Sequence, residues 1–425
     1  MKSQRLLCYS RAVKNASVNR ENHSRRLRTL VVAGLALAAG HAAADAGDTL
    51  NFVAGTTVRN DDNLFRLPAG LTDAQLQVLI GQPSKSEQVR VGYLGIQFDK
   101  AYSQQKFHFD ATATTYRYKN FSRLNFEAFD YAGAWNWHLT QHLSGRLSVD
   151  HKQTQASFAS STNYSGNNTT TNESRRFDAD WWVHGSWHLL GAASQNKQRN
   201  SQLNTADDSF VQNSAESGLR YVAESGSSLT LLARKARGEY AERPLNAVSL
   251  LDTGYRQTDA ELQANWLLSG KSRLNGRLTR LERKHDNFSA RDYSGTAGKF
   301  DYILAPTGKL QLSFSAARAI GSYHENAHSY YVNDSLTFAP AWQISAKTAL
   351  RLNLESSRRD YLGGAVVPPA TGRQDRTRTA QLSLDWSPLR ALTLTGSLQR
   401  DSRTSNQANL DFEAAAASIT AQISF

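Results

Sequence analysis

The chain has 425 residues, of which 40% are hydrophobic and 20% are charged, and its formal net charge at pH 7 is +12. A mean hydropathy of -0.53 excludes a membrane protein built from many apolar helices. An aromatic content of 10%, with apolar stretches up to the end, excludes a disordered chain. Evenly spaced apolar segments within a polar average predict a transmembrane β-barrel, because half of each strand faces lipid and half faces water.

The first residues have the order of features found in a secretory signal peptide. A basic segment ends with three arginines between residues 25 and 28, an apolar segment follows over 30–40, and residues 42–44 form an Ala-x-Ala cleavage site. The apolar segment is too short to span a membrane. We therefore predict a signal peptide over residues 1–44 and a single barrel domain over 45–425, with export by the general or the twin-arginine route left open.

Removal of the signal peptide changes the charge and the sulfur content. The leader carries eight Lys or Arg residues and one Glu, which leaves a net charge of +5 on residues 45–425. Such a small surplus does not predict nucleic-acid binding. The mature chain has neither Cys nor Met, which excludes disulfides, thiolate chemistry and metals held by cysteine.

The mature sequence repeats a unit of two amphipathic strands joined by a short turn. An aromatic residue ends one strand, a short turn rich in Ser, Gly or Pro follows, and a Leu-x-Leu strand begins. Intervals of 34 to 50 residues between these aromatics are too irregular for a propeller or solenoid. Nine hairpins predict an all-β fold, a closed antiparallel up-and-down transmembrane β-barrel of about 18 strands (roughly 16–20), each of about 9–11 residues. We expect the outer loops to include residues 60–88, 156–173, 240–254 and 359–375.

Seven aromatic residues lie at the turn ends of the predicted strands. A membrane barrel carries its periplasmic aromatic girdle at this position. A platform on which sugar rings stack is the alternative, and we favour the girdle. The seven are Trp137, Trp187, Tyr221, Trp266, Tyr302, Trp342 and Trp386.

Charged residues alternate with apolar residues along the strands, and period two places them together on the lumen face. Acidic rows and basic rows fall on neighbouring strands, where cross-strand ion pairs form. We favour a ladder of ion pairs that holds the wall over a basic track that guides an anionic polymer. The candidate lumen charges are Asp110, Asp130, Arg146, Asp178, Asp180, Arg234, Asp259, Glu261, Arg273, Arg277, Arg351 and Glu355, and Trp182 is the candidate lumen aromatic.

The last strand ends at Phe425, with Ile419, Ala421 and Ile423 on the same face. A terminal Phe on an alternating strand resembles the C-terminal sorting signal of bacterial outer-membrane barrels. Together with the signal peptide, it predicts a multi-pass protein of the outer membrane of a Gram-negative bacterium, with both termini in the periplasm.

One segment resembles a metalloprotease motif. Residues His324 to His328 match the pattern H-E-x-x-H, which binds zinc on a helix, where its two histidines share a face. Here the segment falls in a polar loop between two predicted strands. His184 and His188 are expected on one strand face, too far apart at the rise of a strand to share a metal ion. We predict no catalytic residue, no metal site, no cofactor and no enzymatic activity.

The start of the mature chain carries a family resemblance. Residues 48–68 comprise a first strand followed by Asp61-Asp62-Asn63-Leu64-Phe65-Arg66. This segment resembles the EpsL-type outer-membrane proteins of exosortase-associated exopolysaccharide operons, and hairpins such as the one from Trp386 to Leu394 are similar too. The resemblance implies export of an extracellular polysaccharide across the outer membrane. The expected partners are outer-membrane lipids, the barrel-assembly machinery, the polysaccharide, and separate periplasmic and inner-membrane export components, but no nucleic acid.

Two other functions stay open at this point. A general or solute-specific porin would constrict its pore with a long inward-folded loop, for which residues 60–88 are the candidate. A surface-anchoring, lectin-like barrel would hold capsule polysaccharide and would be plugged. A barrel of 16–18 strands leaves an aqueous channel, which favours conduction.

Overall fold

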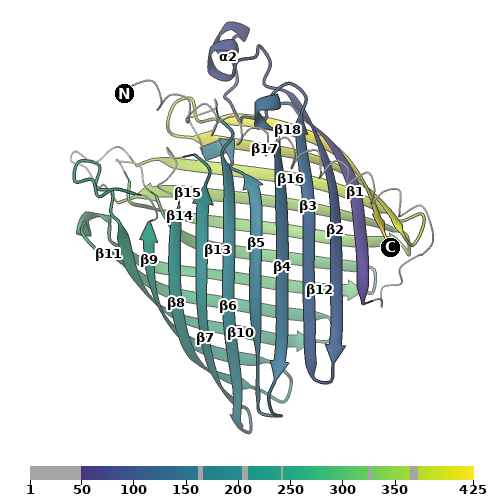
Figure 1. Ribbon diagram of the computed structural model, residues 1–425, viewed down its shortest axis with the longest axis vertical. Coiled ribbons are helices and arrows are strands. Elements are labelled where there is room, and N and C mark those ends of the chain that lie inside the picture. Colours follow the sequence, from purple (N-terminus) through teal and green to yellow (C-terminus); the bar gives the residue numbers. More distant parts are fainter. Residues whose placement is uncertain (1–48, 161–165, 203–208, 241–242, 324–327, 364–371) are drawn as a thin grey trace, which may run out of the picture.

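The computed structural model describes residues 49–160, 166–202, 209–240, 243–323, 328–363 and 372–425. These residues form a closed barrel of eighteen antiparallel strands, in which β1 also pairs with β18 (Figure 1). The predicted fold class and strand number are confirmed. The predicted signal peptide lies outside the described residues.

The strands follow one another around the wall in chain order. Their bounds are β1 (Leu50–Asp61), β2 (Glu87–Tyr102), β3 (Gln105–Tyr118), β4 (Phe126–His138), β5 (Leu143–Gln155), β6 (Thr169–His184), β7 (Trp187–Asn200), β8 (Phe210–Val222), β9 (Ser228–Tyr240), β10 (Gly254–Ser269), β11 (Ser272–His285), β12 (Tyr293–Thr307), β13 (Leu310–Ser322), β14 (Tyr330–Ser345), β15 (Thr348–Leu362), β16 (Gln374–Trp386), β17 (Leu392–Ser405) and β18 (Phe412–Ser424).

Short and long connections alternate, so the barrel has a turn end and a loop end. The longer connections carry the helix α2 (Asp73–Ile80) and the 3-10 helices η1 (Ser122–Leu124), η2 (Phe158–Ser160) and η4 (Ser289–Arg291). Helix α2 projects beyond the rim at the loop end (Figure 1). Within the described ranges, the chain has no helix with the length and apolarity needed to cross a membrane.

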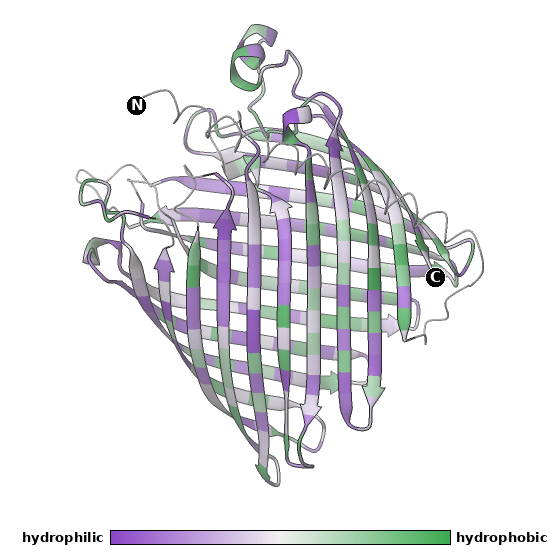
Figure 2. Ribbon diagram, viewed as in Figure 1, coloured by the Kyte–Doolittle hydropathy of each residue, from purple (hydrophilic) through white to green (hydrophobic). Residues whose placement is uncertain are grey.

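Hydrophilic and hydrophobic residues alternate along many of the strands (Figure 2), as expected where successive side chains point to opposite faces of the wall. On β10, Asp259 and Glu261 are 3% and 6% exposed, whereas Trp266 on the other face is 56% exposed. The face of Asp259 is the inner one, because ion pairs on it join strands that are not adjacent, such as Arg176 of β6 with Glu216 of β8. Side chains two strands apart converge only on the concave side of a closed wall.

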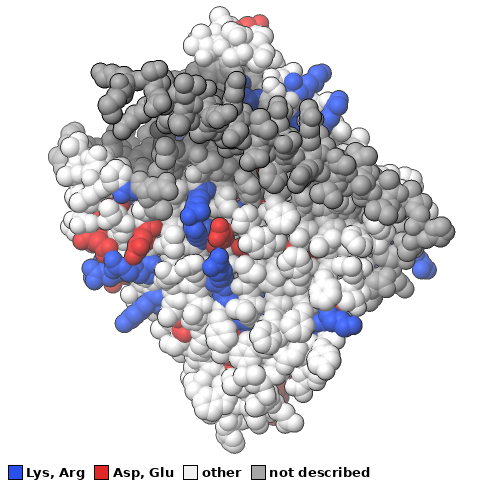
Figure 3. All heavy atoms as spheres, in the orientation of Figure 1, with Lys and Arg blue, Asp and Glu red and all other residues white. Residues whose placement is uncertain are grey.

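The outer face changes from apolar to charged along strands such as β16. On β16 the outward positions from Ala380 to Trp386, nearer the turn end, are apolar, and the outward positions Arg376 and Arg378, nearer the loop end, are charged. We call these zones the apolar belt and the charged rim. Figure 3 shows charges between the loop end and the middle of the visible wall, and almost none toward the turn end.

The charged rim explains why the expected strand length is wrong. The strands run for 12 to 16 residues, because many of them, such as β16, continue past the apolar belt into a polar or charged segment. The loops are correspondingly shorter than expected. Residues 62–86 join β1 to β2, and residues 241–253 join β9 to β10.

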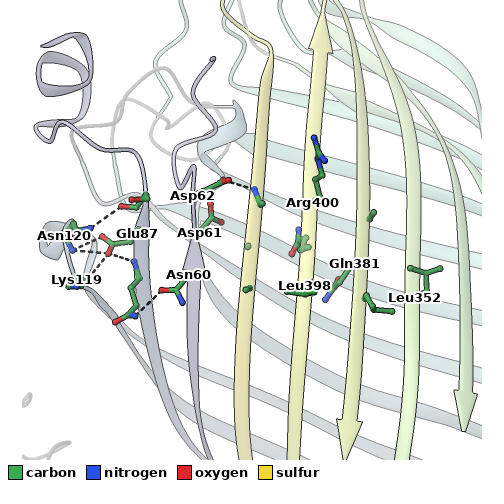
Figure 4. Close-up of a pocket in the computed structure, with 18 residues that line it drawn as sticks. Asn60, Asp61, Asp62, Glu87, Lys119, Asn120, Leu352, Gln381, Leu398 and Arg400 are labelled. Atoms are coloured by element: carbon green, nitrogen blue, oxygen red, sulfur yellow. Dashed lines mark hydrogen bonds between the residues drawn. The ribbon is translucent and has the colours of Figure 1, made fainter. Parts of the chain in front are cut away.

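Two compact structures lie at the loop end, and we call them rim knots. In the first, Glu87 at the start of β2 accepts hydrogen bonds from the backbone of residues 119–121 (Figure 4). In the second, Asp252 before β10 accepts them from residues 287–288. The first knot contains the main apolar cluster, whose members are Phe65, Leu67, Leu76, Ile80, Val89, Tyr118, Phe121 and Leu124.

Candidate functional site: the lumen

The inner face can be followed from strand to strand by register. Asp178 of β6 lies opposite Arg146 of β5, and Asp259 of β10 lies opposite Arg234 of β9. The same face passes through all the strand pairs around the closed wall. It carries all twelve candidate lumen charges: Asp110, Asp130, Arg146, Asp178, Asp180, Arg234, Asp259, Glu261, Arg273, Arg277, Arg351 and Glu355.

Glu216 on β8 is the centre of the largest ion-pair network. It lies 2.6 Å from the guanidinium of Arg176 on β6 and 3.0 Å from that of Arg234 on β9. Arg234 also reaches Asp259 of β10, at 3.2 Å, and Arg176 reaches Asp178 on its own strand, at 2.7 Å. One network therefore links four strands, and its central carboxylate is only 5% exposed.

A second network lies nearer the turn end. Asp180 of β6 lies 2.7 Å from Arg220 of β8 and 2.7 Å from His188 of β7. Trp182 lies on the same inner face, opposite His188, and the two rings stack 6.4 Å apart. Its indole N–H donates to the carbonyl of Gly185, at 2.6 Å.

These networks border a lumenal cavity of about 810 Å³. Six cations, Lys106, Arg146, Arg176, Arg220, Arg234 and Arg277, and four carboxylates, Asp178, Asp180, Glu216 and Glu261, line it. Arg277 is 61% exposed and lies 3.5 Å from Glu261. The side chains of Arg146 and Arg273 make no ion pair or hydrogen bond with any other residue of the described ranges. We call this side, from β5 to β11, the charged wall. Cations outnumber carboxylates on it, so it carries a surplus of positive charge.

The opposite side of the lumen, from β13 to β18, is mainly hydroxyl and amide, and we call it the neutral wall. Gln381 of β16 donates to the hydroxyl of Ser397 on β17, at 3.2 Å, and the same hydroxyl accepts from Ser383, at 3.3 Å. Seven charged residues of the described strands also face inward here: Arg351, Glu355, Arg359, Asp375, Asp385, Asp401 and Arg403. Arg351 pairs with Asp385, and Glu355 lies between Thr337 and Thr379.

Two of the candidate carboxylates serve local contacts near β3 and β4. Asp110 lies 2.6 Å from Nε2 of His108, whose Nδ1 lies 2.8 Å from Asp99. Asp130 accepts a hydrogen bond from the backbone of Gln153, at 2.8 Å. Among the described residues, no group of three His, Cys, Asp or Glu side chains has an arrangement that could hold a metal ion.

The seven aromatics of the predicted girdle lie on the outer face near the turn end. Six are partly or largely exposed: Trp187, Tyr221, Trp266, Tyr302, Trp342 and Trp386. Trp137 differs, because it is only 6% exposed. Its ring covers Gly145 and stacks on Phe177, 5.7 Å away. It therefore packs between strands, and of the seven only the other six present a face to the outside of the barrel.

Phe425 also faces outward, at the junction of the first and last strands. Its ring stacks on Phe52 with centroids 5.7 Å apart, and the two residues exchange backbone hydrogen bonds of 2.6 and 2.9 Å. The residue thus closes the wall, and its role in sorting stays a prediction.

Two expectations from the sequence need comment. The placement of His184 and His188 on one strand is wrong, because β6 ends at His184 and β7 begins at Trp187. Residues 324–327 of the H-E-x-x-H segment lie outside the described residues. Glu216, Arg176 and Arg220 were not among the candidate residues, although Glu216 and Arg220 are in phase along one strand. The period-two test that selected Asp178 and Asp180 would have found them.

Comparisons with known proteins do not assign the chain to a family. No protein-family model and no curated protein matches the chain. Among solved structures, Pseudomonas aeruginosa OccK2 (OpdF) is 12% identical, with a TM-score of 0.49 over 88% of this chain and 97% of that chain. OpdK with vanillate, from the same organism, is 12% identical, with a TM-score of 0.48 over 88% and 99%. The siderophore receptor PirA, also from that organism, is 12% identical, with a TM-score of 0.42 over 90% and 81%. Similarity at this level assigns no function to the chain.

Proposed function

We propose that the chain is an outer-membrane β-barrel through which an extracellular polysaccharide is exported. An apolar belt around a closed antiparallel wall suits a bilayer, because no backbone polar group is left at an open edge. Eighteen strands leave room for an aqueous channel. In this orientation the loop end faces outward and the turn end, with both termini of the barrel, faces the periplasm.

The observation that carries this proposal is the division of the lumen into two walls. A sugar polymer presents many hydroxyl groups, each a donor and an acceptor, and the Ser, Thr and Gln side chains of the neutral wall match them. Uncharged hydrogen bonds contribute only about 1 kcal/mol each in net terms, so a chain can exchange one contact for the next. The positive surplus of the charged wall attracts acidic sugars.

A porin for small solutes is the second candidate, and a different observation favours it. Part of the mouth is covered by residues 156–160, which follow β5. The Arg403 guanidinium on the inner face of β17 donates to the carbonyl of Ala159, and Phe158 packs on Phe65, 4.7 Å away. A covered mouth suits a small solute. By contrast, α2 in the 60–88 segment lies beyond the rim (Figure 1), away from the place expected for a constriction loop.

A bilayer recording tests conduction of the polymer. The purified barrel should show current blockades when an anionic polysaccharide is added. The double variant Arg146→Gln/Arg273→Gln removes two lumen cations without stranding a carboxylate, so blockades should become several-fold rarer while the folded barrel is retained. Arg90→Gln on the outer face is the matched control and should leave the blockades unchanged.

A gene deletion separates the two candidates. Loss of secreted polysaccharide with normal uptake of small solutes supports export. Normal polysaccharide with impaired uptake supports the porin. A barrel that binds surface polysaccharide but carries no current would support the lectin-like anchor instead.

A further inference from the structure

We propose that four arginines on the outer face of β15 to β17 form a binding site for a phosphorylated, multiply acylated glycolipid of the outer leaflet. The four are Arg358, Arg376, Arg378 and Arg400, and we call them the arginine cluster. This site is separate from the lumen. It rests on the proposed function only in placing the barrel in an outer membrane with its loop end outward.

The register brings the cluster together in an arrangement that is unfavourable without an anion. Arg376 of β16 lies directly opposite Arg358 of β15, and like charges in directly opposite positions destabilise a sheet. Arg378 is two residues further along the same face, about 7 Å away. Arg400 of β17 lies opposite Ala380, which makes it the diagonal neighbour of Arg378. A bound phosphate would relieve this repulsion.

Only two of the four arginines in the cluster form ion pairs with carboxylates of the described residues. Arg358 lies 3.2 Å from Asp360, and Arg400 lies 3.0 Å from Glu413. The side chains of Arg376 and Arg378 are exposed and have no ion pair or hydrogen bond with any residue in the described part of the chain. Two positive charges therefore stay available for a ligand at the boundary between the charged rim and the apolar belt.

The surface next to the cluster is an apolar groove of about 620 Å³. It is lined by Phe300, Phe314, Leu336, Phe338 and Leu354, with Arg378 and Arg400 among its polar lining residues. Phe314 and Phe338 stack 4.7 Å apart, and Leu336 is 66% exposed. Figure 4 shows the same order on the neighbouring surface, where Arg400 lies nearer the loop end than Leu398 and Leu352.

This order of groups defines the ligand chemistry. Guanidinium groups bind phosphate oxygens through paired N–H donors, and the groove beside them accepts acyl chains. The groove draws its lining from β12 to β17, a breadth that suits several chains on one headgroup better than two. The cluster lies on the loop-end side of the belt, which is the level of the outer leaflet. A phosphorylated glycolipid of the lipid A type has all of these features.

The matched control lies on the other side of the barrel. Lys197 and Arg199 of β7 are also two cations two residues apart on the outer face at the loop end. Lys197 differs in lying directly opposite a carboxylate, that of Glu173, instead of another arginine. A double variant there removes the same formal charge without removing an uncompensated cluster.

The test is native mass spectrometry of the full barrel in nanodiscs, titrated with lipid A or with phosphatidylglycerol. Arg376→Gln/Arg378→Gln should weaken lipid A binding at least tenfold, and Lys197→Gln/Arg199→Gln less than twofold. Equal loss in the two variants, or no loss in either, would overturn the site. An equal loss of phosphatidylglycerol binding would overturn the assignment to a glycolipid.

Heat-modifiable gel mobility shows that each variant is folded. The titration contains no polysaccharide, so its result does not depend on conduction. A barrel that fails the conduction test but shows the selective tenfold loss contradicts the proposed function and leaves the glycolipid site standing.

Discussion

The two rim knots have nearly the same backbone design but opposite interiors. Both are built on the tripeptide Asn-Phe-Ser, at residues 120–122 and 287–289. In each knot a carboxylate binds the backbone amides that precede a 3-10 helix, and a side chain after the helix accepts from the end of the preceding strand. Asn125 accepts from Tyr118 N, and Asp292 accepts from His285 N, both at 2.7 Å.

The difference lies in the last residue of each 3-10 helix. Leu124 is fully buried in the apolar cluster of the first knot. Arg291, its counterpart, is 1% exposed and donates to four backbone carbonyls, those of Ser249, Leu250, Tyr323 and His328. The first knot has α2 and Phe65 to pack against, whereas the connections around Arg291 present backbone carbonyls to its guanidinium. The same turn is thus filled by an apolar residue or by a cation, according to what the neighbouring connections supply.

We expect the largest loss of stability in a rim knot when the guanidinium of Arg291 is removed. Arg291→Met leaves four carbonyls without their donors, and at about 1 kcal/mol each the second knot should lose about 4 kcal/mol. Hydrogen exchange measures this as local opening, about a thousandfold faster for amides of residues 285–293. The peptide covering residues 119–125 is the internal control and should not change. Unaltered exchange at 285–293 would mean that the four bonds do not hold the knot.

We expect a smaller loss of stability when Leu124 of the first knot is truncated. Leu124→Ala leaves a cavity in the apolar cluster, at a cost of about 3 kcal/mol. Amides of residues 119–125 should then exchange about a hundredfold faster, while those of residues 285–293 keep their protection. If both knots open in this variant, they are coupled through the rim and are not independent units.

The Glu87 and Asp252 carboxylates should contribute about equally to the stability of their knots, because they accept hydrogen bonds from equivalent backbone positions. Glu87 accepts from Phe121 N at 2.7 Å, and Asp252 accepts from Phe288 N at 2.8 Å. Glu87→Gln and Asp252→Asn should each cost about 2 kcal/mol, measured as faster exchange in the affected knot alone. A large cost for one and none for the other would show that the shared design is only apparent.

The smallest effect concerns pH in the second knot. Burial alone would raise the pKa of the Asp252 carboxyl, but hydrogen bonds from Asn287, Phe288 and Gly254 outweigh it and hold the pKa below the ordinary value of 3.8. The knot therefore gains stability that is present above about pH 3.8 and is lost as the pH falls through the lower folded value. Exchange at residues 285–293, corrected for intrinsic rates, should accelerate below that pH in the wild type. Asp252→Asn should abolish the acceleration, and its persistence would assign it to another group.

The fold was largely predictable because its signal is local. Alternation such as Leu350, Leu352 and Leu354 against polar neighbours identifies a strand without knowledge of its partners. The strand ends were not predictable in this way. A segment such as Arg376 to Arg378 belongs to the sheet but has the hydropathy of a loop, because its outward positions are charged.

The sequence predicts which residues of the site face the lumen, but it does not predict which of them contact one another. Asp178 lies opposite Arg146, as strand order suggests, yet it pairs with Arg176 of its own strand, which also reaches Glu216 two strands away. Curvature of the wall brings such side chains together, and a single sequence contains no measure of curvature. The rim knots were missed although Asn-Phe-Ser occurs twice in the sequence.

The junction of β1 and β18 has a consequence for assembly. The Thr57 and Thr420 hydroxyls lie 2.8 Å apart although 363 residues separate them in the chain, and β18 follows the other seventeen strands of the barrel in chain order. Until it arrives, the sheet has two unpaired edges, each a template for pairing with another chain. Bringing β1 and β18 together across so long a segment of chain costs about 5 kcal/mol in chain entropy. The hydrogen bonds between these two strands must outweigh this cost when the barrel closes. A chain cut short before Phe412 would therefore be an open sheet prone to aggregation, and not a smaller barrel.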